Sequence, residues 1–186
     1  MDILPTAITD FNRTQRDLQK FWLFSMFVAG KNSDFASAKV SALMNQMPQE
    51  CEPIDHLRNC DVEAMLRKVK VGQYTRLTKA IIGSMSVDLN TATLDQLMAI
   101  HGVGAKTSRF FLVHSRINCR HAVLDVHLLK FLRDNGHPLA PKQTPSGKAY
   151  LHWEKVFLNI CDLNYLGESI ASIDLRLWME ISGRAA

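Results

Sequence analysis

Two residues of this sequence have types and positions that suit covalent catalysis. Lys106 directly follows the run Gly102-Val103-Gly104-Ala105, and Asp125 comes 19 residues later in the run Leu124-Asp125-Val126-His127. A neutral lysine amine is a nucleophile that forms a Schiff base with an electrophilic carbon. A carboxylate held in place stabilises positive charge that develops in a transition state. The pair therefore indicates attack by Lys106 on a centre that becomes cationic, with Asp125 stabilising that charge.

Both residues also have simpler interpretations. Asp125 precedes an apolar run over 126–132, and aspartate is a favoured N-cap of a helix. Lys106 taken alone could be a phosphate contact or a solvated lysine. Each residue by itself therefore leaves its role open.

A helical hairpin is predicted to position Lys106. Thr91 or Thr93 can cap a short helix through Ile100, the run His101-Gly102-Val103-Gly104 turns the chain, and a second helix opens near Ala105. Glycines adopt the backbone angles that such a tight turn needs, and Val103 between them can plug back into the core. Backbone N–H groups at the start of the second helix can approach a phosphate. The same helix end opposes positive charge, which favours a neutral amine on Lys106.

Positive charge is concentrated around this hairpin. The segment 101–133 holds six lysines and arginines, one carboxylate and four histidines, whereas the whole chain has a net charge of +4. Its net charge therefore exceeds that of the whole chain, as expected for a face that contacts phosphates. A solvated helix face is the alternative, and charge alone does not separate the two.

The remaining sequence predicts further helices. Apolar residues recur at helical spacing over 17–29, 62–69, 74–85, 148–163 and 168–181, and also after Ser33, a candidate cap, as far as Pro48. Gly30 is a natural stop for the first of these helices, and Asp61 could cap the helix over 62–69. No stretch alternates with a period of two for long enough to predict a sheet. We therefore predict an all-α fold.

Composition limits the class of protein. The chain has 186 residues, of which 47% are hydrophobic and 22% charged, as in ordinary globular domains. No apolar run reaches the roughly 20 residues of a membrane span, and no secretion signal is recognisable. The four cysteines form no CxxC pair, and Cys51, His56 and Cys60 offer too few ligands for a zinc site. We expect a single intracellular domain, in the cytoplasm or nucleoid, or in the nucleus of a eukaryote.

The hairpin and the lysine–aspartate spacing resemble the helix-hairpin-helix DNA glycosylases, a superfamily that includes endonuclease III and the 8-oxoguanine DNA glycosylases. In those enzymes a lysine follows Gly-Val-Gly-x, and the aspartate of a Val-Asp-x-His run comes 18 to 19 residues later. The run from Ile173 through Trp178 to Gly183 is similar to the C-terminus of the short, archaeal-type 8-oxoguanine enzymes. The joint occurrence of Lys106 and Asp125 at the family spacing favours the catalytic interpretation of both.

The chain departs from the family pattern at several positions. His101 stands where the family usually has proline, and Ser108 where it often has alanine. Cys161 is the only cysteine after Cys119, so the four-cysteine cluster of endonuclease III is missing and no iron–sulfur cluster is expected. No other cofactor is expected except a structural monovalent cation.

The resemblance implies an architecture. Residues 1–186 would form one glycosylase unit of two helical lobes, with the hairpin and Asp125 at the cleft between them. The central lobe would span about 30–130, with the helix-hairpin-helix motif at 93–116. The second lobe would combine 1–29 with 131–186.

The resemblance also implies roles for further residues. Backbone carbonyls of Met98, Ile100 and Val103 would hold the monovalent cation. DNA contacts are expected from two groups of residues: Gly102, Val103, Gly104, Arg109 and His127 around the hairpin, and Lys31, Asn32, Gln73 and Tyr74 in two other turns. The pair at 31–32 would fill the gap left by a flipped base, and the pair at 73–74 would wedge into the stack. Trp178 would stack on the extruded base. A plain turn at 31–32, a structural role for His127 and core packing of Trp178 are the alternatives.

The expected function is a bifunctional DNA N-glycosylase and AP lyase of base excision repair. It would remove an oxidised purine, with 8-oxoguanine as the expected base, through a Schiff base on Lys106 followed by β-elimination. The partner would be damaged double-stranded DNA, with no membrane, and the protein a monomer. Three alternatives remain: a glycosylase for another damaged base, a non-catalytic helix-hairpin-helix DNA-binding module, and a scaffold that binds protein.

Overall fold

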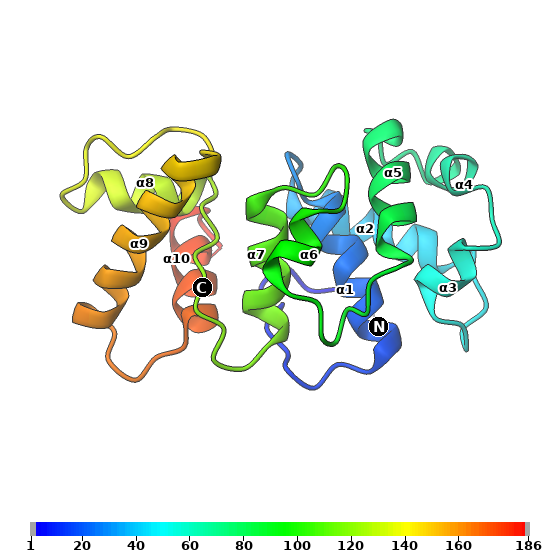
Figure 1. Cartoon of the computed structure of the whole chain (residues 1–186), viewed down its shortest axis with the longest axis horizontal. Helices are drawn as coiled ribbons and strands as arrows, with labels where there is room; N and C mark the ends of the chain where they lie inside the picture. The colour runs from blue at the N-terminus through cyan, green and yellow to red at the C-terminus, as the bar shows by residue number, and fades with distance from the viewer. Residues whose placement is uncertain (1–2, 185–186) are drawn as a thin grey trace.

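The computed structural model describes residues 3–184, and over this range the chain forms helices and no strand (Figure 1). The helices are α1 (Gln15–Phe27), α2 (Ser33–Met44), α3 (Pro53–Leu57), α4 (Val62–Val69), α5 (Tyr74–Ser84), α6 (Leu94–Met98), α7 (Ala105–Ser115), α8 (Val126–Asp134), α9 (Gly147–Asn164) and α10 (Ile170–Ile181). The predicted all-α class is confirmed. None of the described helices has the length and apolar composition that crossing a bilayer requires.

Most helix ends match the local sequence signals. Asp61 caps α4 through a hydrogen bond from the Ala64 N–H, as its position before the apolar run indicated. One expectation was wrong, and one helix was missed. Asn32 rather than Ser33 caps α2, because its Oδ1 accepts the N–H of Asp34 (2.8 Å). Helix α3 was not predicted, because five residues are too few to show a period.

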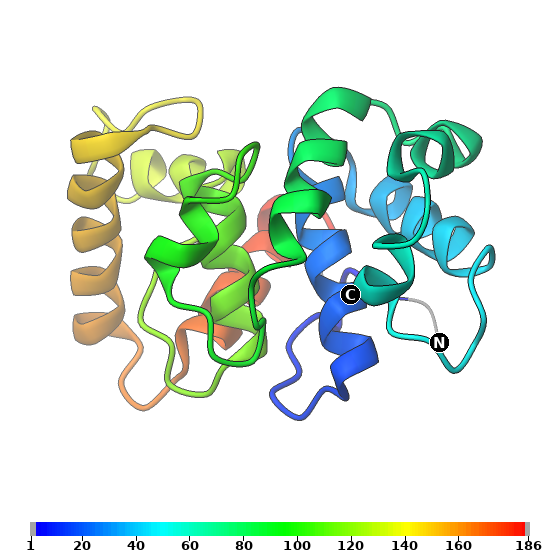
Figure 2. The same cartoon turned by 45° about the vertical axis from the view of Figure 1, so that its right-hand side comes forward.

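Helix α7 lies at the centre of the arrangement. It contacts α1, α6 and α10, and α10 in turn contacts α8. Figure 1 shows α8, α9 and α10 at one end of the molecule and α3 and α4 at the other, and in Figure 2 α9 (orange) again lies at the opposite edge from α3 and α4. Helix α1 contacts α2, α3, α5 and α7, which associates it with the central helices. The division into lobes at about residues 30 and 130 stays a prediction.

The core is built around α1. Every residue from Leu18 to Phe27 is buried, and Trp22 lies edge-on to the Phe111 ring of α7 with 4.9 Å between centroids. The indole N–H of Trp22 donates to the hydroxyl of Ser84 on α5 (2.7 Å), which satisfies the polar atom of a fully buried ring. These contacts fix α5 and α7 relative to each other through α1.

The helix-hairpin-helix forms as the sequence predicted. Thr93 and Gln96 make a reciprocal capping box at the start of α6. Gly102 has a φ of +85°, in the left-handed region that favours glycine. Val103 is buried, and its N–H donates to the carbonyl of Ile100 (3.0 Å). The apolar residue between the two glycines therefore plugs into the core, and α7 begins immediately afterwards.

Arg76 on α5 holds the hairpin turn in place. Its guanidinium donates to the carbonyl of Gly102 (2.9 Å), to the carbonyl of Met26 near the end of α1 (2.8 Å) and to Oε1 of Gln73 (2.6 Å). These three acceptors come from three separate segments of the chain. One side chain thus fixes the hairpin relative to the turn after α1 and the turn before α5.

Arg109 joins α7 to α9 in the interior, and this corrects the prediction that it contacts DNA. The Arg109 side chain is only 2% exposed, and two of its nitrogens donate to the two carboxylate oxygens of Glu154 (2.7 and 2.8 Å). The guanidinium also lies over the Tyr150 ring. Although burial opposes ionisation of Glu154, hydrogen bonds from His121, Arg109 and the Ala122 N–H outweigh it and lower its pKa to about 2.

The close approach at Gly102 generates the first prediction. A Cβ added at Gly102 would lie 2.9 Å from the carbonyl oxygen of Arg76, whereas one added at Gly104 would meet nothing within 4 Å. We expect Gly102→Ala to lower the free energy of unfolding by about 1–3 kcal/mol, because it combines a positive φ with a clash against backbone. Gly104→Ala, the matched control, should change it by less than about 0.5 kcal/mol. Equal effects of the two substitutions in urea denaturation would contradict this description of the turn.

The buried pair generates a second prediction. Removing one partner of a buried ion pair leaves a charge uncompensated, so Glu154→Gln should cost about 3–5 kcal/mol at pH 7. Glu154 has a lowered pKa in the folded protein, so its contribution is present above its unfolded value and is lost as pH falls from 4.5 towards 2. The difference in unfolding free energy between wild type and Glu154→Gln should therefore shrink below pH 4.5. A difference that stays constant down to pH 3 would show that the carboxylate charge is not what stabilises the pair.

Candidate active site

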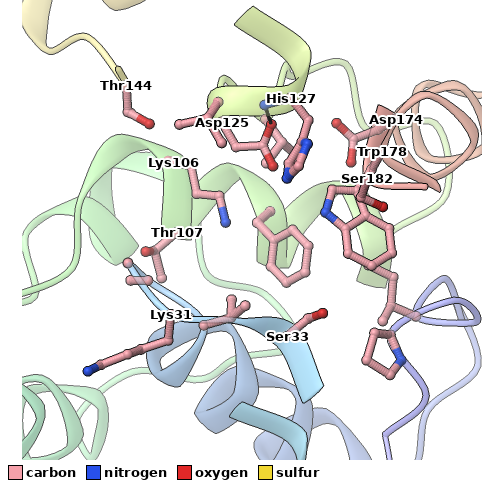
Figure 3. A pocket seen from close by; sticks show the side chains of 18 of the residues that line it. Lys31, Ser33, Lys106, Thr107, Asp125, His127, Thr144, Asp174, Trp178 and Ser182 are labelled. Atoms are coloured by element: carbon pink, nitrogen blue, oxygen red, sulfur yellow. Dashed lines mark hydrogen bonds between the residues drawn. The ribbon is translucent and has the colours of Figure 1, made fainter. Parts of the chain in front are cut away.

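A cavity of about 970 Å³ lies where α1, α2, α7, α8 and α10 meet. Figure 3 shows polar side chains projecting into it from several of these helices. Its lining includes Lys31, Asn32, Ser33, Gly104, Lys106, Phe110, Asp125, His127, Thr144, Asp174, Trp178 and Arg184. Residues that are distant in the sequence are thus brought to one site.

Lys106 reaches the cavity from the first turn of α7. Gly104 is the N-cap of this helix and leaves its first N–H groups uncovered by any side chain at that position. The Lys106 Nζ lies 4.7 Å from the centroid of the Phe110 ring, one turn further along the same helix. Lys106 and Phe110 both line the cavity, and Figure 3 shows the Lys106 side chain projecting into it.

Asp125 stands at the start of α8 and also faces the cavity. Its Oδ1 accepts the backbone N–H groups of His127 and Leu128, both at 2.9 Å. Asp125 is therefore an N-cap, as its position before the apolar run indicated, and the two bonds fix the direction of the carboxylate. Capping and presentation of a charge to the cavity are compatible in this geometry, because one oriented carboxylate does both.

Trp178 forms part of the cavity wall instead of the core. The ring is half-buried, lies edge-on to His127 with 6.4 Å between centroids, and has the Arg184 guanidinium 5.3 Å from its centroid. Arg184 in turn donates to both carboxylate oxygens of Asp34 (2.5 and 2.9 Å). This ion pair joins the segment after α10 to the first turn of α2.

The two turns expected to enter DNA lie side by side. A Cβ added at Gly72 would lie 3.8 Å from the Lys31 Nζ, and the Gln73 amide donates to the carbonyl of Ala29 (3.1 Å). Lys31 is exposed and lines the cavity together with Asn32, whose side chain caps α2. Gln73 and Tyr74 do not line the cavity. They lie in and next to the turn held by Arg76, and the Arg67 guanidinium covers the Tyr74 ring.

The residues of the predicted cation site, Met98, Ile100 and Val103, are not among those that line the cavity. Helix α6 ends at Met98, and the carbonyl of Ile100 already accepts the Val103 N–H. The carbonyls of Met98, Ile100 and Val103 follow the end of a helix, where carbonyl groups lack intrahelical partners. Such carbonyls suit a monovalent cation, and this site stays a prediction. Among residues 3–184, no group of three or more His, Cys, Asp or Glu side chains is arranged to hold a metal.

Two buried residues at the site were not predicted. Asp174 on α10 lines the cavity and is only 8% exposed. Its Oδ2 lies 3.1 Å from Nε2 of His114, which is fully buried on α7. The sequence does indicate that Asp174 is unusual, because it falls on the apolar face of α10 that Ile170, Ile173 and Leu177 define. A charged residue is rarely placed on such a face without a partner. The partner itself lies 60 residues away and could not be identified from the sequence.

Three solved structures have a similar fold. The 8-oxoguanine DNA glycosylase of Methanocaldococcus jannaschii aligns with a TM-score of 0.71 at 18% identity over 95% of this chain and 84% of its own. The same enzyme in complex with a 15mer DNA containing 8-oxoguanine aligns with a TM-score of 0.68 at 16% identity over 94% of this chain and 85% of its own. The 8-oxoguanine DNA glycosylase of Thermotoga maritima gives a TM-score of 0.64 at 21% identity, over 91% and 82%.

The likeness to these structures concerns the fold. It covers nearly all of this chain, so the predicted all-α fold is shared with these three structures. No protein-family model matches the chain. The chemistry of the site therefore has to be argued from the side chains that line the cavity.

Proposed function

We propose that this protein is a DNA N-glycosylase with AP-lyase activity that removes an oxidised purine, 8-oxoguanine, from duplex DNA. The observation that carries the proposal is the convergence of Lys106 and Asp125. They start two different helices and both face a cavity of about 970 Å³. A nucleophile and an oriented carboxylate in one cavity are what cleavage of a glycosidic bond at an anomeric carbon requires.

The two residues would act in sequence. As the bond between sugar and base breaks, positive charge develops on the sugar, and the oriented Asp125 carboxylate stabilises it. The neutral amine of Lys106 attacks the anomeric carbon, and the base leaves. The bond between the anomeric carbon and the ring oxygen then breaks, the ring oxygen gains a proton as the nitrogen loses one, and the opened sugar is held on Lys106 as a Schiff base. Loss of a proton from the adjacent carbon eliminates the 3′ phosphate and nicks the strand.

The rest of the site fits a base that has left the duplex. An enzyme that acts on a base in DNA must take it out of the stack and into a pocket. The half-buried Trp178 ring in the cavity wall offers a stacking surface. The uncovered N–H groups at the start of α7 and the exposed Lys31 can bind backbone phosphates.

The solved structures that share this fold support the choice of substrate. All three are 8-oxoguanine DNA glycosylases, and one of them contains DNA with 8-oxoguanine. The capping bonds of Asp125 support one competing function, a DNA-binding module without catalysis, because they explain this residue without any charge at a sugar. The two experiments below separate the enzyme from that module.

The first experiment tests the nucleophile. Borohydride reduction should trap a covalent adduct between the wild-type protein and a duplex that carries 8-oxoguanine or an abasic site, because it fixes a Schiff base on Lys106. Lys106→Gln should form no adduct and should retain DNA affinity to within about tenfold, since it loses at most one phosphate contact. Lys130→Gln, on the exposed face of α8, is the matched control and should still be trapped.

The outcomes of trapping separate the substrates. Trapping only on the abasic duplex would keep the lyase and exclude 8-oxoguanine as the base removed. No adduct on either duplex, with salt-sensitive DNA binding intact, would instead support the binding module.

The second experiment tests whether Asp125 does more than cap α8. Asparagine is as good an N-cap as aspartate, so Asp125→Asn should leave the free energy of unfolding within about 0.5 kcal/mol of wild type. Release of free 8-oxoguanine should nevertheless fall about 100-fold or more, because the charge that stabilises the cationic sugar is gone. Asp125→Ala should lose the same activity and also about 1 kcal/mol of stability. Unchanged base release by Asp125→Asn would show that Asp125 is a cap only.

A further inference from the structure

A chain of three hydrogen-bonding side chains leads from the cavity wall into the protein. Asp174 Oδ2 lies 3.1 Å from His114 Nε2, and His114 Nδ1 lies 2.8 Å from the hydroxyl of Thr9. Asp174 is 8% exposed and His114 is not exposed at all. The Phe110 ring lies edge-on to the imidazole with 5.0 Å between centroids, which helps to fix the orientation of the His114 ring. Asp174 is thus a carboxyl group with a fixed orientation.

This carboxyl group shares the cavity with Lys106 and Asp125, but the reaction steps proposed above use only the latter two residues. All three line the same cavity, and Figure 3 shows Lys106 and Asp174 entering it from different helices. Burial raises the pKa of Asp174, the charge of Asp125 raises it further, and His114 and Lys106 act in the opposite direction. An acid in such surroundings holds a proton more readily than an exposed carboxylate does.

The charged and titratable groups around the pair come from every element packed against it. They are Lys106 of α7, Asp125 and His127 at the start of α8, Tyr150 and Cys161 of α9, and Arg13, which donates to the His114 carbonyl at 2.7 Å. Three cations line the cavity together with Asp174: Lys106, Lys31 and Arg184. Arg184 is paired with Asp34, and Lys106 is the cation whose charge lowers the pKa of Asp174.

We propose that Asp174, oriented by His114, accepts the proton that Lys106 must lose before it can act as a nucleophile. This inference rests on the proposed function, because it assigns a source to the neutral amine. One N–H bond of the Lys106 ammonium breaks and one O–H bond forms on Asp174, directly or through water in the cavity. An ammonium and a carboxylate become an amine and a carboxylic acid, so no net charge moves. Asp174 returns the proton when Lys106 is released from the sugar, which restores the starting state.

Displacement of water from the cavity by bound DNA would favour this transfer. Removing water destabilises a separated ammonium and carboxylate more than the neutral amine and acid that replace them. The nucleophile would therefore be generated when the substrate is bound. Asp174 acts through Lys106 and is a positioning residue with respect to the sugar.

Transfer of the proton to Asp174 makes the population of neutral Lys106 amine independent of pH. Lys106 and Asp174 share one transferable proton, which is on the lysine in the resting state and on the aspartate in the reactive state. The ratio of the two states therefore does not depend on pH as long as that proton is present. In Asp174→Asn the reactive amine has one proton fewer than the resting ammonium. Its population then rises tenfold for each pH unit as long as most of the amine is protonated.

Single-turnover nicking of a saturating duplex with one abasic site isolates this step, because no base has to leave. The wild-type rate should change by less than about threefold between pH 6 and pH 8, whereas the Asp174→Asn rate should be lower at pH 7 and rise nearly 100-fold over the same range. Asp174→Glu, which restores the carboxyl group, should again give a flat profile even if its rate is reduced. Asp162→Asn, on the exposed surface of α9 and paired with Arg120, is the matched control for loss of one carboxylate and should keep the wild-type profile.

The pH profiles decide whether Asp174 accepts the proton of Lys106. Profiles of wild type and Asp174→Asn that run parallel, at whatever rates, would show that Asp174 is only structural. If Asp174→Asn does not fold, the wild-type profile alone is decisive, because a tenfold rise per pH unit in the wild type contradicts the proposal. A wild type that does not nick the abasic duplex at any pH would overturn the proposed lyase function itself, which is a different result from either of these.

Discussion

The position of the candidate nucleophile depends on a turn that tolerates no side chain. Gly102 has a φ of +85°, and any Cβ there would meet the backbone of Arg76 at 2.9 Å. The same Arg76 donates to the Gly102 carbonyl and to the end of α1. This close approach determines where α7 starts and therefore where Lys106 enters the cavity. The aromatic core around Trp22 and Phe111 then holds α7 along its length.

The cavity is organised by helix starts. Helix α7 begins at Gly104 with Lys106 in its first turn, and α8 begins at Asp125. A helix N-terminus attracts anions, which suits both the carboxylate that caps α8 and the phosphates expected near α7. Asp174 is the exception, because it comes from the middle of α10 and depends on His114 for its orientation. The capping and phosphate-binding roles thus follow from helix N-termini, whereas the proposed proton-accepting role follows from the contact between α10 and α7.

Sequence reasoning identified what is encoded locally. The capping box at Thr93, the glycine turn and the caps at Asp61 and Asp125 each occupy a few consecutive residues, so their side-chain types were enough. It failed where the partner is distant. Arg109 was assigned to DNA because it lies in a basic segment, but its partner Glu154 is 45 residues away and buries it. The three acceptors of Arg76 and the pairing of Asp174 with His114 are likewise set by tertiary contacts that no local pattern shows.

The central claim is that Lys106 forms the covalent bond to DNA inside this cavity. The most direct test is to trap wild-type protein on a duplex containing 8-oxoguanine with borohydride, digest the complex and locate the sugar remnant by mass spectrometry. The account predicts that the remnant is attached to Lys106. Attachment to another lysine, with Lys31, which also lines the cavity, the obvious alternative, or release of 8-oxoguanine without any attachment would contradict it.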